Sequence, residues 1–259
     1  MRGAEAAPRR PSVKTAIAAV ALLLLGRAET SSAWAQAPPA AESTAPRVAV
    51  SIVLAVDASG SVSPERFDLQ KLGYAQAFRD PRVLRVIFSR PGNTIAVTMT
   101  QWTGPNMQVQ VIPWTLVRDD AAASRIADSI AATRRLLTNG GTSISGAIDH
   151  AVGLLAQCPC RSDRRVIDIS GDGANNNGRP ASEARDAALA ADIVINGLPI
   201  LVLEPNLETY YRDNVIGGPG AFVIATKSYD QFADAIVRKL VLEIAGDTVQ
   251  HDRRAEAPH

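Results

Sequence analysis

The chain has 259 residues, of which 46% are hydrophobic, 20% are charged and 5% are aromatic, and its formal net charge is +1 at pH 7. This composition is ordinary for a soluble globular protein, and the excess of Ala, Val, Ile and Leu over aromatic residues suits an α/β core. A nucleic-acid-binding protein would need a clustered basic face, which the balanced charge does not suggest, so we expect no nucleic-acid partner.

The N-terminus has the features of a targeting signal. A basic stretch with Arg9, Arg10 and Lys14 precedes an apolar run, residues 15–25, that is too short to span a bilayer, and Ala33-Trp34-Ala35 offers a cleavage site. We therefore predict a secretory signal peptide over residues 1–35, with an uncleaved membrane anchor as the alternative. The arginine pair also loosely resembles a twin-arginine signal. The expected location is periplasmic or secreted, with no stable membrane span after cleavage.

Three further segments follow the signal. Residues 36–46 are rich in Pro, Ala and Ser and have no apolar period, which is typical of a linker. Residues 246–259 lack an apolar face and are expected to be a disordered tail. Residues 47–245 remain as one domain of a size that a single core can serve. Without residues 1–35, 22 basic residues (27 less 5) face 24 acidic ones (26 less 2), a net charge of −2.

Residues 48–61 are an apolar, β-branched run that ends in the polar sequence Asp57-Ala-Ser59-Gly-Ser61. Such a run is typical of a strand buried on both faces of a parallel sheet, where ligands bind at the carboxyl end of the strands. The alternating carboxylate and hydroxyls can direct three oxygen ligands at one point, which indicates a divalent-cation site. Ser63-Pro64-Glu65 then begins a helix, with Ser63 as its N-cap.

The Asp57-Ala-Ser59-Gly-Ser61 motif resembles the first loop of von Willebrand factor A (vWA) domains, which carry a metal-ion-dependent adhesion site (MIDAS). The resemblance covers about residues 47–245, and the chain is similar to an uncharacterised group of exported bacterial vWA-like proteins. It implies an α/β fold of three layers: a doubly wound, mostly parallel central sheet with one short antiparallel edge strand, related to Rossmann-like folds.

The next elements fit that order. Residues 64–79 have helical apolar spacing, and Asp80-Pro81 ends the helix. Residues 83–88 are apolar and their structure is ambiguous. Residues 94–102 predict a β-branched strand, and residues 108–117 alternate well enough to be its hairpin partner, which matches the antiparallel edge strand of vWA sheets.

A second loop follows a helix that we predict over residues 119–137. Gly140-Gly141-Thr142 leads directly into another helix. In vWA domains a loop of this kind delivers a threonine hydroxyl to the metal, and Thr142 is the residue that matches it here.

A third loop follows the buried strand predicted at residues 165–170. Gly171-Asp172-Gly173 comes next and resembles the vWA loop that supplies a second carboxylate, so Asp172 is the match. The chain departs from the usual pattern by an extra glycine before Asp172 and by an Asn-rich turn at residues 175–178. Asp168 lies inside the strand and points elsewhere, so we assign it a structural role.

The remaining elements continue the alternation of strands and helices that predicts a parallel sheet covered on both faces. Pro199 cannot donate a ladder hydrogen bond, so the strand that contains it should end, bulge or lie near an edge there. Ser228 and Gln231 are a candidate capping box. The predicted elements are a helix at 181–191, a strand at 193–203, a helix at 207–215, a strand at 221–226 and an amphipathic helix at 228–244.

The three loops together predict one metal site. Two carboxylates and three hydroxyls suit Mg²⁺ or Mn²⁺, with an open position left over. In the vWA family that position takes a carboxylate from a partner, so the resemblance implies a protein ligand that presents an acidic side chain. The alternative is that these residues are turn formers and helix caps, as Ser, Thr and Asp often are. The candidate ligands are Asp57, Ser59, Ser61, Thr142 and Asp172.

Enzyme hypotheses find less support. A Ser-His-Asp triad would need His150, and no Gly-x-Ser-x-Gly elbow follows a strand. Asp57-Ala-Ser59 lacks the second acid of an Asp-x-Asp phosphatase motif, and no P-loop or dinucleotide fingerprint occurs. We expect a binding module and no enzyme. A hydrolase whose metal activates water, and a metal-independent assembly scaffold, stay open as alternatives. The partner's identity and the oligomeric state do not follow from the sequence.

Cys158 and Cys160 flank a proline. In an exported protein the pair favours a local disulfide clip at a helix end, with a redox pair as the alternative, and whether the two are joined stays open. So small a ring gains little stability from loop closure.

Overall fold

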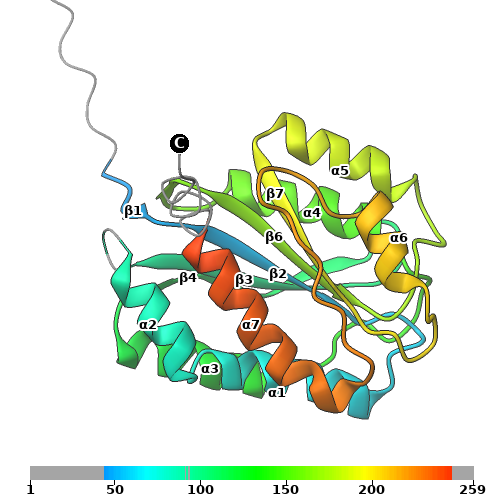
Figure 1. Cartoon of the computed structure of the whole chain (residues 1–259), viewed down its shortest axis with the longest axis horizontal. Coiled ribbons are helices and arrows are strands. Elements are labelled where there is room, and N and C mark those ends of the chain that lie inside the picture. Colours follow the sequence, from blue (N-terminus) through cyan, green and yellow to red (C-terminus); the bar gives the residue numbers. More distant parts are fainter. Residues whose placement is uncertain (1–43, 91, 93, 247–259) are drawn as a thin grey trace, which may run out of the picture. The chain divides into compact units, whose positions relative to one another are not determined.

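A five-stranded sheet forms the centre of the fold, and β2 is its middle strand (Figure 1). The computed structural model describes residues 44–90, 92 and 94–246, so the expected signal peptide, most of the linker and the tail from Asp247 lie outside them. The strand order is β4-β3-β2-β6-β7; all neighbours are parallel except β3 and β4. This confirms the doubly wound α/β class. The strands are β2 (Ser51–Asp57), β3 (Ile95–Trp102), β4 (Gln108–Val117), β6 (Arg165–Gly171) and β7 (Ile193–Pro199).

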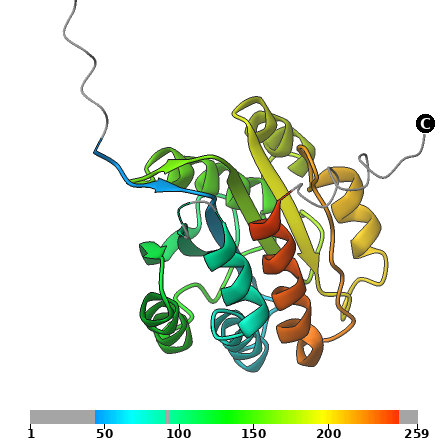
Figure 2. The ribbon, with the colours of Figure 1, turned by 60° about the vertical axis from the view of Figure 1, so that its left-hand side comes forward.

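Two layers of helices cover the sheet. Helices α1, α2, α3 and α7 pack together on one face, and α4, α5 and α6 on the other (Figures 1 and 2). No helix within the described residues is long and apolar enough to cross a membrane. The helices are α1 (Pro64–Ala77), α2 (Pro81–Ser89), α3 (Asp120–Ala132), α4 (Ile144–Ala156), α5 (Ala181–Ala190), α6 (Leu207–Asn214) and α7 (Phe232–Ala245), the last preceded by a 3₁₀ turn at Tyr229–Gln231.

Strand β2 contributes to the core on both of its faces. All seven of its residues are buried. Ile52, Leu54 and Val56 belong to the core under α1, α3 and α7, while Val53 and Ala55 belong to the core under α4 and α5. Successive strand residues point to opposite faces, so a strand between two helix layers must be apolar throughout. This explains why the sequence is nearly continuous in β-branched residues until Asp57.

The register brings the carboxyl ends of three strands to one edge. Asp57 lies opposite Trp102 of β3, and Val56 lies opposite Ser170 of β6. The loops that follow β2, β3 and β6 therefore begin side by side. Parallel strands present their carboxyl ends at a common edge, and this is where open α/β sheets bind ligands.

The structure decides one helix assignment that the sequence left open and corrects another. The ambiguous residues 83–88 are helical: Asp80 caps α2 by accepting from Arg82 N, and Pro81 is its first residue. The helix predicted to reach residue 137 ends at Ala132, because the buried amide of Gln101 pairs with the main chain beyond it. Gln101 Nε2 donates to Arg134 O at 2.7 Å, and Leu136 N donates to Gln101 Oε1 at 2.8 Å.

Three strand and cap predictions also change. The edge strand β4 is antiparallel, as expected, but it has ten residues and is not short. Residues 221–226 form only isolated bridges, from Val223 to Gly197 and from Thr226 to Ile200, and are not a strand. The side chain of Ser228 makes no cap hydrogen bond, so the capping box is wrong. The strand β7 ends at Pro199 and lies at the sheet edge, as its proline predicted.

A small parallel pair ties the start of the domain to the end of α4. Strand β1 (Arg47–Val48) pairs with β5 (Arg161–Ser162). Directly before β5, Cys158 and Cys160 form a disulfide with their Cα atoms 5.2 Å apart. The local clip at a helix end is thus present, since α4 ends at Ala156.

Candidate metal centre

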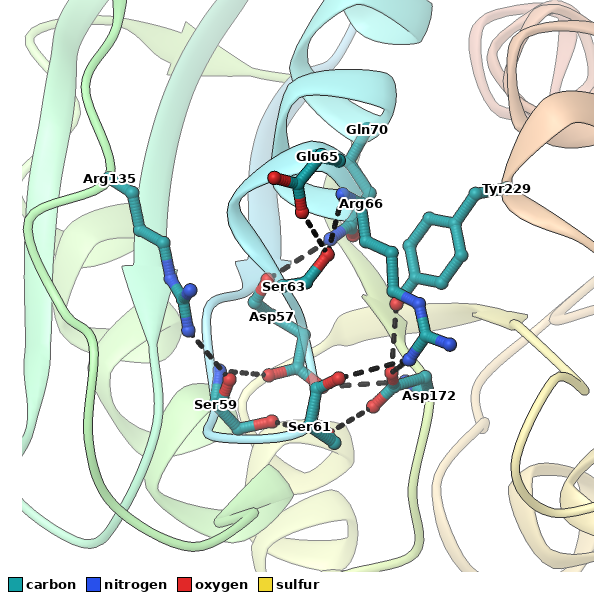
Figure 3. Close-up of polar contacts among 10 residues, drawn as sticks. All are labelled: Asp57, Ser59, Ser61, Ser63, Glu65, Arg66, Gln70, Arg135, Asp172 and Tyr229. Carbon is teal, nitrogen blue, oxygen red and sulfur yellow. Dashed lines mark hydrogen bonds and ion pairs between the residues drawn. The ribbon is translucent and has the colours of Figure 1, made fainter.

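Asp57 is the last residue of β2, and both its side-chain and its main-chain oxygen accept hydrogen bonds. The side chain is fully buried. Its Oδ1 accepts a hydrogen bond from Ser59 N at 2.7 Å, and its main-chain oxygen accepts one from Gln70 Nε2 of α1 at 3.1 Å (Figure 3). The first loop therefore turns around the carboxylate of Asp57, as aspartates do in Asx turns.

The two serines of the first loop lie next to each other and next to the third loop. Ser59 Oγ and Ser61 Oγ are 3.1 Å apart, and Ser61 Oγ donates to Asp172 Oδ1 (Figure 3). Ser59 is buried, whereas Ser61 is exposed. The two hydroxyls thus lie between the buried Asp57 and the protein surface.

Asp172 follows β6 and is also fully buried. Its main-chain N–H donates to Asp57 Oδ2 at 3.4 Å, and its own Oδ2 accepts from Tyr229 Oη at 2.9 Å. Burial, and then the negative charge of Asp172, raise the pKa of Asp57 to about 7. Burial and the same carboxylate raise the pKa of Tyr229 above its usual value. The two carboxylates, of Asp57 and Asp172, are buried next to each other and carry an excess of negative charge that a divalent cation would offset.

The close contact of the first and third loops requires a glycine at position 171. A Cβ at Gly171 would lie 2.9 Å from both Asp57 Oδ2 and the Tyr211 hydroxyl. Tyr211 is fully buried, and its hydroxyl has no hydrogen-bond partner among the described protein atoms. An unpartnered buried donor beside Asp57 fits a site that is completed by further oxygen atoms.

Thr142 joins the set through the Asn-rich turn of the third loop. Thr142 N donates to Asn176 Oδ1 at 2.9 Å, and Thr142 O accepts from the main-chain N–H groups of Asn176 (2.9 Å) and Asn177 (3.2 Å). Thr142 Oγ1 lies 3.5 Å from the place that a Cβ on Gly173 would take. The departure from the usual vWA pattern is therefore a clamp that holds the second loop against the third.

The second loop also contacts the first. Gly60 N donates to Gly140 O at 3.4 Å. Gly140 has φ of +116°, a conformation that favours glycine, and a Cβ there would lie 2.9 Å from Thr103 Oγ1. The structure thus brings together Asp57, Ser59, Ser61 and Asp172 by direct hydrogen bonds and places Thr142 beside them through the third loop.

Two arginines and a tyrosine at the site were missed in the sequence. Arg66 Nη1 donates to Ser61 O at 3.1 Å and lies 3.8 Å from Asp172 Oδ2, and its guanidinium is 5.4 Å from the centre of the Tyr229 ring. Arg135 Nη2 donates to the main-chain oxygen of residue 58 at 2.9 Å and to that of Ser59 at 2.8 Å, the second contact being drawn in Figure 3. No local motif marks these side chains, because each reaches the site from another element.

The donor set determines which chemistry the site can support. The described residues contain no group of three or more His, Cys, Asp and Glu arranged to hold a metal. A cation here would depend on hydroxyl oxygens in addition to Asp57 and Asp172, which is a hard-oxygen set suited to Mg²⁺ or Mn²⁺. The residues present therefore fit the metal that the vWA resemblance implies.

Two other residues considered in the sequence lie elsewhere. Asp168 is buried beneath α7, where its Oδ1 lies 2.9 Å from Lys239 Nζ and accepts from Tyr74 Oη at 3.0 Å. This agrees with a structural role. His150 is half-buried in α4 and lines a pocket of about 290 Å³ together with Asp149, Arg179 and other residues.

Comparison with known proteins places the chain in a family. The family described as "Protein of unknown function (DUF1194)" matches residues 47–248, which is most of the chain. The chain belongs to the DUF1194 family. A search of curated proteins finds no match to this DUF1194 chain.

Solved structures identify the fold of the DUF1194 domain as that of vWA domains. Proximal thread matrix protein 1 from the mussel byssus is 14% identical with a TM-score of 0.57, over 76% of this chain and 48% of the mussel chain. A von Willebrand factor type A protein from Catenulispora acidiphila is 16% identical with a TM-score of 0.50, over 77% and 43%. The pilus adhesin SpaC from Lactobacillus rhamnosus GG is 13% identical with a TM-score of 0.58, over 76% and 30%.

The similarity to these proteins is limited to the fold. The DUF1194 chain spans about half or less of the length of each of them. A further structure of the mussel protein is described as having a zinc-occupied MIDAS motif, with 14% identity and a TM-score of 0.55 over 77% of this chain and 48% of the mussel chain. A vWA fold can therefore hold a divalent metal at the corresponding motif.

Proposed function

We propose that this DUF1194 protein is an exported binding module that holds Mg²⁺ or Mn²⁺ and, through it, an acidic side chain of a partner protein. The proposed ligands, direct or through water, are Asp57, Ser59, Ser61, Thr142 and Asp172. In the same proposal residues 1–35 are a cleaved signal peptide, 36–46 a linker, 47–245 the binding domain and 246–259 a tail. Export rests on the basic and apolar pattern of the first segment and its Ala-x-Ala site.

The observation that carries the proposal is the meeting of three separate loops around two buried carboxylates. Ser61 of the first loop donates to Asp172 of the third, and Asp172 N donates to Asp57. The Asn176 clamp adds the second loop. Turn formers and helix caps satisfy their own local main chain, as Asp57 does with Ser59 N. Ser61 and Asp57, however, also meet Asp172, which lies more than a hundred residues away. Convergence of this kind supports a ligand site.

The charge of the site also supports a cation bound from outside. Asp57 and Asp172 are fully buried, and the guanidinium of Arg66 is 3.8 Å from only one oxygen of Asp172. A divalent cation would balance both carboxylates, and its positions left free by protein oxygens would accept water or a carboxylate. A partner's Asp or Glu side chain therefore matches the site in charge and in atom type.

The test is calorimetric titration of the protein, purified after export, with Mg²⁺, Mn²⁺ and Zn²⁺. We expect one binding event that Asp172→Asn and Thr142→Val weaken at least tenfold. Both changes preserve the shape of the side chain, and neither deletes the two hydrogen bonds that Asp57 accepts within the loops. Ser129→Ala is the control, because Ser129 is an exposed residue of α3 whose hydroxyl donates to Arg125 O.

Two results would decide against the proposal. Equal metal affinity in Asp172→Asn and in the unchanged protein would place the metal elsewhere. An absence of binding for all three cations would leave the metal-independent scaffold as the better hypothesis. If metal binding is found, capture of a partner that depends on the cation and is lost in Asp172→Asn would then establish the second half of the proposal.

A further inference from the structure

Glu204 places a carboxylate against the third loop of the candidate metal centre. Ala174 N donates to both of its oxygens, Oε1 and Oε2, at 3.2 Å each. A Cβ built on Gly173 would lie 3.3 Å from Glu204 Oε1 and 3.5 Å from Thr142 Oγ1. Two atoms that lie this close to one point are less than about 7 Å from each other. The carboxylate is therefore near the hydroxyl of a proposed ligand, at the side where the loops meet solvent.

The backbone of Glu204 is held by a hydrogen bond, whereas its side chain is exposed and contacts the third loop through its carboxylate. Leu207 N donates to Glu204 O at 3.1 Å, which anchors the residue at the start of α6. The side chain is exposed, and within the described residues its two oxygens share the hydrogen bond from Ala174 N. A glutamate has three side-chain torsions, so a change of rotamer moves its oxygens by several ångströms without moving the loop.

Glu65 is a second exposed acid close to the first loop, and its carboxylate has a different role. It lies in the first turn of α1, where its Oε2 accepts from Ser63 Oγ at 2.8 Å. This side chain belongs to the cap of the helix, since Ser63 also accepts from Arg66 N. Glu204 has no comparable role in a helix cap: the helix α6 that follows it has Asn206 as its N-cap. The contact between the Glu204 carboxylate and Ala174 N is thus not part of a helix cap.

The Glu204 carboxylate is the same chemical group as the acidic side chain that we propose for the partner protein. The proposed ligand set leaves an open position that takes a carboxylate oxygen. Glu204 belongs to the same chain, so its effective concentration at the site exceeds that of any external acid at ordinary concentrations. Glu204 therefore competes with external carboxylates for the open position of the metal centre.

We propose that Glu204 is an internal competitor that occupies the open position of the metal centre until a partner's carboxylate displaces it. This inference rests on the proposed function and concerns the regulation of the same site. We take Glu204 to close the site about nine-tenths of the time, and an external ligand then binds about tenfold more weakly than it binds to an open site. Removing the charge of Glu204 should therefore raise the affinity of the metal-loaded protein for a simple carboxylate by about that factor.

The test uses Mn²⁺ as the metal and acetate as the probe. The relaxation of water protons by bound Mn²⁺ measures how many water molecules reach the ion, and acetate that takes a position lowers it. We expect Glu204→Gln to show higher relaxation than the unchanged protein and to be titrated by acetate at about one tenth of the concentration. Glu65→Gln is the matched control, because it removes the same charge close to the first loop while its amide oxygen can still accept from Ser63.

Each outcome can be told apart from a failure of the proposed function. If the unchanged protein binds Mn²⁺ and Glu204→Gln shows the same relaxation and the same acetate midpoint, the inference is wrong and the metal site stands. If Glu204→Gln lowers the Mn²⁺ affinity more than tenfold, Glu204 is a permanent ligand and not a competitor. If the unchanged protein binds no Mn²⁺, the proposed function fails first, and the inference fails with it. Far-ultraviolet circular dichroism of each variant checks that it is folded.

Discussion

The buried cation of α7 allows a prediction that does not depend on any metal. Lys239 Nζ lies 2.9 Å from Asp168 Oδ1 and also bonds Glu243 Oε1, and all three side chains are fully buried. Lys239→Met keeps the length of the side chain but leaves two carboxyl groups without their cation. Breaking a buried ion pair in this way costs about 3–5 kcal/mol. In a domain of this size the midpoint of thermal unfolding should then fall by roughly 6–20 °C.

The assay is urea and thermal unfolding followed by circular dichroism, with Arg212→Met as the control. Arg212 forms an exposed pair with Glu208 one turn away on α6, and exposed pairs contribute little. A loss of less than about 1 kcal/mol for Lys239→Met, or a loss equal to that of the control, would refute the reasoning, because it would mean that the two acids do not need a buried cation.

The same cluster predicts how stability depends on pH. Burial, and then the negative charge of Asp168, raise the pKa of Glu243 from an ordinary value of 4.5 to about 8. The folded protein therefore holds a proton that the unfolded chain releases, and the stability from this group is present at low pH and lost as the pH rises through about 8. Glu243 should account for a loss of about 2 kcal/mol between about pH 6 and about pH 8, and Glu243→Gln should remove that part. Asp57, whose pKa is also raised, to about 7, adds a loss of its own that stays in this variant. A profile that is unchanged in this variant would contradict the assignment.

Three further outcomes follow from single contacts. Gly171→Ala should destabilise the fold by about 1–3 kcal/mol and weaken Mn²⁺ binding, because its Cβ would meet Asp57 Oδ2 and the Tyr211 hydroxyl; urea unfolding and calorimetry measure the two effects. Asn176→Ala should weaken Mn²⁺ binding without removing a ligand, since it frees Thr142 N; unchanged calorimetry would rule out the clamp. Reduction of the Cys158–Cys160 disulfide should lower the unfolding free energy by no more than about 2 kcal/mol, as its ring is short, and a larger shift in the thermal midpoint would contradict this.

Much of the fold could be predicted because its signals are local. The buried run of β2 and the cap at Ser63 are each written in a few adjacent residues, and the structure has both. The order of elements follows from the alternation of strands and helices. The three loop motifs were also recognisable one by one. The meeting of the first and third loops at one edge then follows from the parallel sheet, since the ends of β2 and β6 are level. The second loop lies between α3 and α4, so its position does not follow from the sheet.

The errors have a common physical cause, which is pairing over long distances in the sequence. The apolar residues near position 137 continue the helical pattern of α3, but the buried amide of Gln101 captures the main chain of residues 134–136 instead. Residues 221–226 have strand composition, yet they make only isolated bridges. Lys239 and Glu243 look like the polar face of an amphipathic helix, and only the position of Asp168 beneath them explains their burial.

The candidate site shows most clearly what a motif omits. Several side chains that the motifs do not include bind the main chain of the loops: Gln70 donates to Asp57 O, Arg135 donates to the carbonyl of Ser59, and Asn176 accepts from Thr142 N. Supports of this kind fix the positions of the loops and do not use up the hydroxyls of the serines and the threonine.

A metal site needs both properties, because its ligands must be placed in advance and still have lone pairs to give. The two requirements can be separated by experiment. Changes to the supporting residues should alter the affinity for a cation while the number of sites stays at one, whereas Asp172→Asn should remove a ligand itself. A support variant such as Gln70→Ala that binds Mn²⁺ as tightly as the unchanged protein, while the Asp172 variant does not, would show that the loops hold their positions without help from α1.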